Sequence, residues 1–397
     1  MDRELMNRPR AIIPRTQLAP EQLKIVEMPS DKHLFCTGPA GSGKTQMLIH
    51  RALHLAKLKK LPSDRYCLFV LTDVAKNFIR ADSSIFDLPA ESVTTLDAWC
   101  EHFYEKYISK DLPRIYINLK LDRQEIRSKV LQELQRWKRN ERILDFAVVD
   151  DGQDLAPEFY DILPRVACHI TVFADFRQKI LENATSESFI SEKLEVDRAT
   201  RVPGNSHIND IPILKLAAYF DDEARSVRDG FEREAIALQG SEKPQCYIAP
   251  SFDQEMDHLA ETLRLRLGMG EKAGILLPRP QLLHDLAKEF LKRGLPVEKI
   301  VEPDAQNVLH DSYDFRNQAP KMLTYFSAKG LTFDSVFLPQ LTENNYHGLD
   351  DVRLQRMLFF GISRARHWVY FSTVRGAESR LIEMLIRAQS EDSLLMF

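Results

Sequence analysis

The chain has 397 residues, 44% of them hydrophobic, so it can form two or three domains with cores of their own. Its formal net charge of −4 provides no overall attraction to nucleic acid, although a local groove can still be basic. Five scattered cysteines without a C-x-x-C pair argue against a zinc site and against a secreted disulfide framework. The first residues lack the apolar core of a signal peptide and no apolar run reaches the roughly 18 residues of a membrane span, so we expect a cytoplasmic protein that does not contact a membrane.

Strands alternate with helices along the chain, a pattern that favours parallel sheets covered by helices on both faces. In the first half, the expected strands are residues 33–37, 66–71, 146–149 and 171–174. An irregular segment at residues 195–209 predicts a domain boundary. In the second half, the expected strands are residues 245–249, 274–277, 322–325, 335–338 and 368–372, with a helix at residues 281–293. We therefore expect two α/β domains, residues 1–195 and 196–397.

A phosphate-binding loop is the most specific signal in the sequence. Residues Gly38 to Thr45 read G-P-A-G-S-G-K-T and complete the pattern G-x-x-x-x-G-K-[ST] between an expected strand and an expected helix. The glycines Gly38, Gly41 and Gly43 allow backbone N–H groups to turn towards phosphate oxygens at the positive end of the helix. Lys44 is expected to contact the β- and γ-phosphates, and the Thr45 hydroxyl is expected to bind Mg²⁺. The sequence therefore predicts binding of a nucleoside triphosphate.

Two carboxylates follow a buried strand about 105 residues after this loop. The segment Phe146-Ala-Val-Val ends in Asp150 and Asp151. A phosphate-loop enzyme needs one carboxylate to hold the Mg²⁺ shell and a second one to orient the attacking water. An acidic pair at the end of a strand is also common as a solvated turn, but the position after a phosphate loop favours the metal site.

Further polar motifs follow expected strands. Thr171-Val-Phe-Ala-Asp175 leads into Gln178, Ala328-Lys329-Gly330 forms a glycine turn, and Gly361-Ile-Ser-Arg364-Ala-Arg366 contains a closely spaced arginine pair. In this order, the motifs resemble those of the UvrD/Rep-like branch of superfamily 1 DNA helicases. The similar segments are Leu18–Gln22 (Q motif), Gly38–Thr45 (I), Leu71–Asn77 (Ia), Val93–Cys100 (Ib), Asp150–Asp154 (II), Ala174–Gln178 (III), Arg201 (IV), Thr324–Asp334 (V) and Gly361–Ala365 (VI). The resemblance extends from about Leu18 to Ser372.

This resemblance implies two RecA-like P-loop NTPase domains with parallel sheets, ATP bound in the cleft between them, and ATP hydrolysis coupled to cleft closure on single-stranded DNA. It implies that Lys44, Thr45 and Asp150 bind the triphosphate and Mg²⁺. Asp151 replaces the glutamate that activates water. The further implied roles are adenine recognition for Gln22, γ-phosphate sensing for Gln178, arginine fingers acting across the cleft for Arg201 and Arg364, and close approach of the backbone to the phosphate for Gly330.

The departures from the family pattern are unevenly distributed. Asp151 carries one methylene fewer than glutamate, which withdraws the carboxylate and predicts slow hydrolysis. The residues that face single-stranded DNA in the family are largely replaced, for example by Asp73, Leu96, Asp97 and Phe326. Loss of aromatic stacking and added negative charge predict weaker strand binding.

The accessory insertions of the family are short in this chain. The first is reduced to about residues 101–145, mostly a helix with basic residues around Trp137 (Arg136, Lys138, Arg139 and Arg142), and the second leaves a helical extra at about residues 206–244. The basic residues either contact phosphates or belong to a solvated helix with Trp137 packed inward.

Two functions are compatible with these observations. The first is a reduced UvrD-like, helicase-type ATP hydrolase that uses ATP and Mg²⁺ and acts on single-stranded DNA, with little unwinding by the isolated chain. The alternative is a nucleotide-gated switch or sensor subunit with a decayed DNA track, in a complex with a protein partner such as a nuclease subunit of an antiviral (anti-phage) defence system.

Overall fold

The structure, a computed structural model, describes residues 12–39, 41–83, 85–116, 119–137, 142–176, 185–202, 210–220, 242–301, 313, 315 and 317–397. The chain divides into two compact units. The first comprises Met1–Asn205 and Glu302–Asp314, and the second comprises Ser206–Val301 and Phe315–Phe397. Each unit contains one fully parallel sheet between helices, which confirms the predicted fold class.

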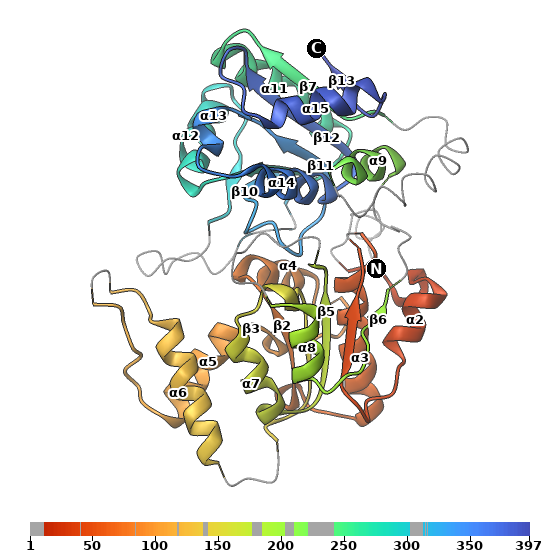
Figure 1. The fold of residues 1–397 in the computed structure, drawn as a ribbon, viewed down its shortest axis with the longest axis vertical. Coiled ribbons are helices and arrows are strands. Elements are labelled where there is room, and N and C mark those ends of the chain that lie inside the picture. The colour runs from red at the N-terminus through yellow and green to blue at the C-terminus, as the bar shows by residue number, and fades with distance from the viewer. Residues whose placement is uncertain are drawn as a thin grey trace. The chain divides into compact units, whose positions relative to one another are not determined.

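The sheet of the first unit has six strands in the order β3-β2-β4-β5-β1-β6 (Figure 1). The strands are β1 (Leu34–Thr37), β2 (Tyr66–Val70), β3 (Val93–Thr95), β4 (Leu144–Val149), β5 (Ala167–Ala174) and β6 (Thr200–Arg201). Because β6 pairs with β1 and Val202 N donates to Thr37 O (2.7 Å), the first unit runs ten residues past the boundary expected after residue 195.

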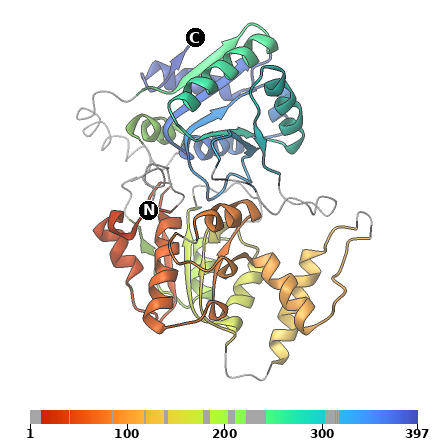
Figure 2. The same ribbon diagram turned by 180° about the vertical axis from the view of Figure 1, so that it is seen from behind.

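Helices cover both faces of this sheet, because its strands are apolar on both sides. The helices are α2 (Pro20–Val26), α3 (Lys44–Lys59), α4 (Asp73–Ser83), α5 (Leu96–Tyr107), α6 (Arg123–Arg136), α7 (Pro157–Val166) and α8 (Glu187–Lys193). Alternate residues of β4 enter different cores: Phe146 and Val148 pack with α2, α3 and α4, whereas Ala147 and Val149 pack with α5, α6, α7 and α8. Figure 1 shows α7 and α8 in front of the sheet, and Figure 2 shows α3 and α4 in front of it.

The expected insertion contains α6 and the end of α5 rather than a single helix. Asp122 caps α6, since its Oδ1 accepts from Glu125 N (3.0 Å). The Trp137 ring lies 5.3 Å from the ring of Phe103 and 5.0 Å from that of Tyr107, so this tryptophan packs against α5. Of the predicted basic residues, Lys138 and Arg139 lie outside the described residues.

The sheet of the second unit has seven strands in the order β13-β7-β12-β11-β8-β10-β9. The strands are β7 (Gln245–Ala249), β8 (Ala273–Leu277), β9 (Glu298–Lys299), β10 (Lys321–Thr324), β11 (Phe333–Leu338), β12 (Ala365–Val374) and β13 (Leu395–Met396). The helices are α9 (Ile211–Tyr219), α11 (Phe252–Gly268), α12 (Pro280–Lys292), α13 (Glu343–Tyr346), α14 (Asp351–Ser363) and α15 (Leu381–Ser390).

One face of this second sheet packs against α11 and α12, which stand in front of it in Figure 2. On the other side, α14 contacts α9, α15 and the strands β11 and β12. The predicted helical extra at residues 206–244 includes α9, which packs against α14 and β12 of this unit. Residues 206–209 and 221–241 lie outside the described residues. Within the described ranges, no helix is long and apolar enough to cross a lipid bilayer.

Candidate nucleotide-binding site

The predicted phosphate loop connects β1 to α3 at the carboxyl edge of the first sheet. Gly41 and Gly43 have φ angles of 72° and 82°, in the left-handed region that glycine adopts at little cost. At Gly38, an added Cβ would lie 2.6 Å from Cβ of Val202, so glycine is required there by close packing. The loop ends at Lys44, the first residue of α3, where the free N–H groups of a helix attract anions.

Lys44 is held at the centre of this loop. Its Nζ donates to the carbonyl oxygens of Gly38 (3.0 Å) and Pro39 (2.8 Å) and lies 3.4 Å from Oδ2 of Asp175, which follows β5. The side chain is only 9% exposed. The ammonium group thus lies inside the loop that would surround a phosphate chain.

The hydroxyl of Thr45 contacts the first of the two predicted carboxylates. Thr45 Oγ1 donates to Asp150 Oδ2 over 2.7 Å, although the two residues are 105 positions apart in the chain. Asp150 directly follows β4 and is buried. Burial and the neighbouring carboxylate of Asp151 raise the pKa of Asp150 to about 7. A cation beside this carboxylate would offset both effects.

Asp151 has a special backbone conformation, with φ 50° and ψ 42°. Aspartate tolerates this left-handed region better than most residues do. Its backbone N–H donates to Asp150 Oδ1 (3.1 Å), and its own Oδ1 accepts from Gln153 Nε2 (3.2 Å). The turn after β4 therefore fixes the two carboxylates relative to each other.

Gln153 connects the ends of two strands, a role that the sequence analysis did not assign. Its fully buried side chain donates from Nε2 to Asp154 Oδ2 (2.6 Å), and its Oε1 accepts from the backbone N–H of Asp175 (2.9 Å). Asp175 in turn contacts Lys44. The motif Asp150-Asp-Gly-Gln-Asp154 contained a signal for this role, because binding of Mg²⁺ does not by itself explain why Gln153 and Asp154 are polar.

Gln22, predicted to recognise adenine, contacts the phosphate loop. Its Nε2 donates to the carbonyl oxygen of Ser42 (2.9 Å), and its Oε1 accepts from the backbone N–H of Ala19 (2.9 Å). Its position is close-packed, since a Cβ added to Gly43 would lie 2.5 Å from Nε2.

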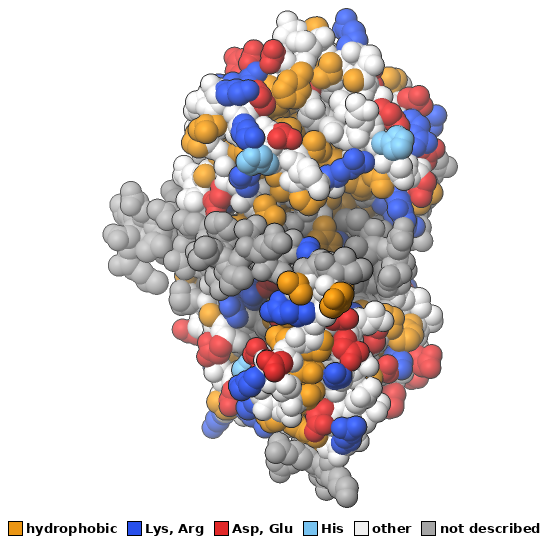
Figure 3. All heavy atoms as spheres, turned by 90° about the vertical axis from the view of Figure 1, so that its left-hand side faces the viewer, with side chains coloured by type: hydrophobic (Ala, Val, Ile, Leu, Met, Phe, Trp, Pro, Cys, Tyr) orange, Lys and Arg blue, Asp and Glu red, His pale blue; other side chains and the backbone are white. Residues whose placement is uncertain are grey.

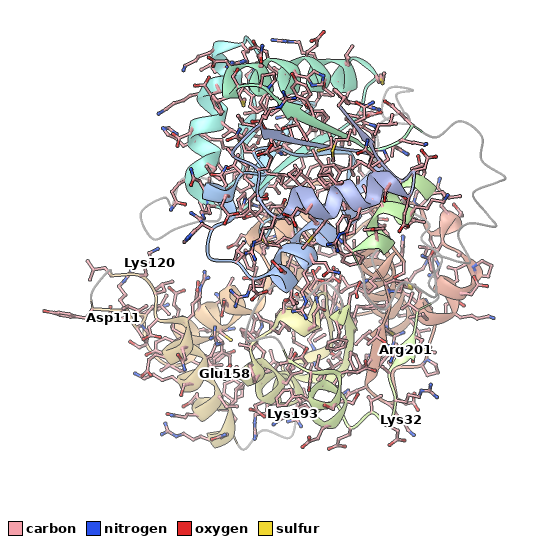
Figure 4. The ribbon with its side chains drawn as sticks, turned by 45° about the horizontal axis from the view of Figure 1, so that its top comes forward. Lys32, Asp111, Lys120, Glu158, Lys193 and Arg201 are labelled. Carbon is pink, nitrogen blue, oxygen red and sulfur yellow. The ribbon has the colours of Figure 1, made fainter. Side chains whose placement is uncertain are left out.

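The two predicted arginine fingers have different surroundings. Arg201 lies on β6 and thus in the first unit, whereas the sequence placed it in the second domain (Figure 4). Its Nη1 donates to Thr37 Oγ1 (2.8 Å), and its Nη2 pairs with Glu187 (3.1 Å). Its role as an arginine finger stays a prediction.

Arg364 lies in the second unit, at the end of α14. Its guanidinium is buried, stacks on the ring of Phe360 (4.6 Å) and donates to Ser363 Oγ (3.1 Å). Gly330, in the same unit, has φ 74°, in the left-handed region that glycine adopts at little cost. Gln178 lies outside the described residues.

The first unit provides the chemical groups that a nucleotide and Mg²⁺ require. The buried Ser42 hydroxyl in the loop has no hydrogen-bond partner among the residues that the structure describes, and it could donate to a phosphate oxygen. Among these residues, no group of three or more His, Cys, Asp and Glu side chains could hold a metal alone. Mg²⁺ does not need such a group, because it is commonly held by one or two protein oxygens with water and substrate phosphates. Thr45 and Asp150 fit that requirement.

A second region at the carboxyl edge, here called the α5 edge, consists of Asp73, Asp97, Glu101, Arg123 and Arg127. Asp97 Oδ1 accepts from Arg127 (2.9 Å), Glu101 pairs with Arg123 (3.2 Å), and Asp73 pairs with Lys76. The basic side chains of α6 thus face carboxylates of α5. On the face that Figure 3 shows, basic and acidic side chains of the first unit are likewise interspersed.

Comparisons with known proteins support the fold. No protein-family model and no curated protein matches the chain. Among solved structures, S. cerevisiae Dbp5 bound to RNA and ADP BeF3 matches with a TM-score of 0.50 and 12% identity, over 96% of this chain and 94% of that chain. The C-terminal domain of a possible DNA helicase from Lactobacillus plantarum WCFS1 matches with a TM-score of 0.36 and 18% identity, over 48% of this chain and 99% of that chain. Each unit therefore has a RecA-like fold.

Proposed function

We propose that this protein is an ATP hydrolase of the DNA-helicase type, of the reduced UvrD/Rep-like kind that its motifs resemble. The hydrogen bond between Thr45 and Asp150 carries this proposal, because it joins the two side chains that such an enzyme uses for Mg²⁺. The position of Lys44 inside the loop, the buried Ser42 hydroxyl and the helix N-terminus support it.

Each residue of the site has a distinct task in this proposal. Lys44 and the N–H groups at the start of α3 bind the β- and γ-phosphates, and Thr45 with Asp150 would hold Mg²⁺, which neutralises phosphate charge when bound. Asp151 orients the attacking water and accepts its proton. Gln153 fixes Asp151 through the hydrogen bond to Oδ1.

Four predicted contacts with the nucleotide remain predictions for substitution to test. They are γ-phosphate sensing by Gln178, charge stabilisation by Arg201 and by Arg364, and close approach of the Gly330 backbone. Alanine at Gln178 or Arg364 should lower ATP turnover more than it lowers ATP affinity, because both residues are expected to act on the developing charge of the transferred phosphoryl group. We also place the protein in a reducing cytoplasm, where its five free cysteines would stay reduced.

The test is ATP turnover by the purified chain, with and without single-stranded DNA, beside a Lys44→Ala variant. We expect slow turnover that Lys44→Ala lowers by at least about a hundredfold, because the lysine contacts the transferred phosphate. Lys76→Ala is the matched control, since Lys76 pairs with Asp73 at the α5 edge and should not affect basal turnover. Equal turnover by the Lys44→Ala variant would refute the proposal.

The ion pairs of the α5 edge favour a second candidate function. Arg123 and Arg127 of α6 are paired with Glu101 and Asp97 of the same unit, so these two cations are not free for DNA phosphates. This supports a nucleotide-gated switch or sensor subunit that acts on a protein partner, such as a nuclease of an antiviral defence system, in place of a motor on single-stranded DNA. Turnover that DNA stimulates strongly would exclude the switch, whereas tight ATP binding with turnover indifferent to DNA would support it.

A further inference from the structure

Arg51 is a fully buried arginine on α3, seven residues after Lys44. Its hydrogen-bond partners are neutral groups. Its acceptors are the carbonyl oxygens of Ile25 (3.2 Å), Val26 (3.2 Å), Met28 (2.9 Å) and Pro29 (3.4 Å), the hydroxyl of Thr171 (2.7 Å) and Nε2 of His169 (3.0 Å). A buried charge is costly unless hydrogen bonds compensate for it, so an arginine at this position indicates a specific task.

The carbonyl acceptors belong to the end of α2 and to the segment that follows it. The last carbonyl groups of a helix have no partner within the helix and carry the negative end of its dipole. The Arg51 guanidinium satisfies several of them together, which a lysine with three donors at one point could not do in the same geometry. Arg51 therefore fixes the carboxyl end of α2 to α3.

The other two acceptors fix Arg51 to the sheet. Thr171 Oγ1 accepts from Arg51 Nε and lies 2.9 Å from Nε2 of His169, so these three side chains form a closed group. Burial and the charge of Arg51 lower the pKa of His169 to about 3, so the imidazole is neutral and its Nε2 can accept a hydrogen bond. The guanidinium thus joins α2, α3 and β5.

The opposite end of α2 contacts the phosphate loop through Gln22. The amide of this residue caps the first turn of α2 through Ala19 and donates to the carbonyl oxygen of Ser42. Helix α2 is therefore attached to the loop–α3 segment at two points: Gln22 holds the loop before Lys44, and Arg51 holds the helix about two turns further on.

We propose that Arg51 is a positioning residue for nucleotide binding, which acts through α2 by holding Gln22 against the phosphate loop. This inference rests on the proposed function, since it concerns the affinity of the same loop. Arg51 touches no phosphate in this scheme, so its loss should weaken ATP binding and leave the chemical step unchanged.

A double-mutant cycle of Arg51→Lys and Gln22→Ala in the full chain tests the inference. Loss of the Gln22 hydrogen bonds should raise the Kd for ATP, measured with Mg²⁺ present, by about two- to tenfold. Arg51→Lys should raise it by a similar factor, raise KM without changing kcat, and add less than about twofold in the Gln22→Ala background. Hydrogen exchange of the α2 amides should accelerate in Arg51→Lys without nucleotide.

Arg266→Lys is the matched control, because Arg266 is also buried but stacks on Trp368 of the second unit (3.7 Å). It should leave the Kd for ATP unchanged. If Arg51→Lys does not fold, Thr171→Val removes one acceptor of the same arginine and should raise the Kd in the same direction by a smaller factor.

Two results would overturn the inference alone: an unchanged Kd in Arg51→Lys, or an effect of Arg51→Lys that persists in full without Gln22. Absence of ATP binding by the wild-type chain would overturn the proposed function and this inference together, and the wild type alone reports that outcome.

Discussion

The phosphate loop and the α5 edge lie on the same sheet edge and are built from similar charged residues, yet they balance charge differently. In the loop, the ammonium of Lys44 is bound mainly by backbone carbonyl oxygens, and Asp150 is bound by a hydroxyl. At the α5 edge, arginines and carboxylates of neighbouring helices pair directly. The first arrangement leaves charge available for a ligand, whereas the second largely neutralises it within the chain.

This difference gives the two regions different relations to ligands. A loop whose cation is held mainly by carbonyl oxygens, and whose carboxylate Asp150 is held by a hydroxyl, can exchange those contacts for phosphate and Mg²⁺ at modest cost. An edge whose arginines are already paired must first lose its ion pairs, so phosphates of a nucleic acid compete with Asp97 and Glu101 there.

The largest effect is expected on ATP turnover, from substitutions at the phosphate-loop site. Asp151→Asn should lower ATP turnover about a hundredfold or more while leaving the Kd for ATP within about twofold, because asparagine tolerates the left-handed backbone but cannot accept the proton of water. Asp151→Glu, which restores the length of the side chain, should raise turnover above the wild-type rate. Single-turnover and binding measurements check both. An unaffected rate in Asp151→Asn would mean that another group orients the water.

A smaller effect is expected on the affinity for single-stranded DNA, from a substitution at the α5 edge. Asp97→Asn frees Arg127 from its 2.9 Å ion pair and should raise the affinity for single-stranded DNA by up to about tenfold at low salt, measured by fluorescence anisotropy. Glu125→Gln is the matched control, because it makes the same charge change on α6 and disturbs only the exposed pair with Lys129. Equal affinities for the wild type and Asp97→Asn would show that DNA does not reach this edge.

The smallest effect is expected on the pH dependence of the Tm. In the folded chain without ligand, the pKa of Asp150 is raised to about 7 from its ordinary value of 3.8. The folded state therefore holds this proton more tightly than the unfolded state does, and the stability that this provides is lost as the pH rises through about 7. In the presence of a chelator, the Tm of the wild type should fall a few degrees more between pH 6 and pH 8 than the Tm of Asp150→Asn. Parallel pH profiles for the two chains would contradict this assignment.

Much of the fold follows from patterns that the sequence displays. Long apolar runs between polar turns predicted β4 and β5, because strands buried on both faces consist almost entirely of apolar residues. The short strands β3 and β6 escaped prediction, since two or three residues carry no periodic signal and their pairing depends on neighbours distant in the chain. The pairing of β6 with β1 moved the domain boundary for the same reason.

The candidate site could be predicted as far as its motifs are local. Lys44, Thr45 and Asp150 lie together as expected, because motifs at the carboxyl ends of parallel strands meet at one edge. The contacts of Gln22 with Ser42 and of Gln153 with Asp175 could not be predicted, since side chains that bind backbone atoms of other segments leave no spacing rule. The contribution of Arg51 was hidden within an ordinary helix pattern.

The position of β1 in its sheet has a consequence for the synthesis of this protein. The strand that leads into the phosphate loop has two neighbours, β5 and β6, and both are made much later: Leu34 pairs with Thr171, and Thr37 with Arg201. At roughly 5–20 residues per second, a ribosome needs on the order of ten seconds to deliver them. During that interval β1 lacks both partner strands, and non-local parallel pairing is slow in itself. The loop can therefore form only near the end of the folding of its unit.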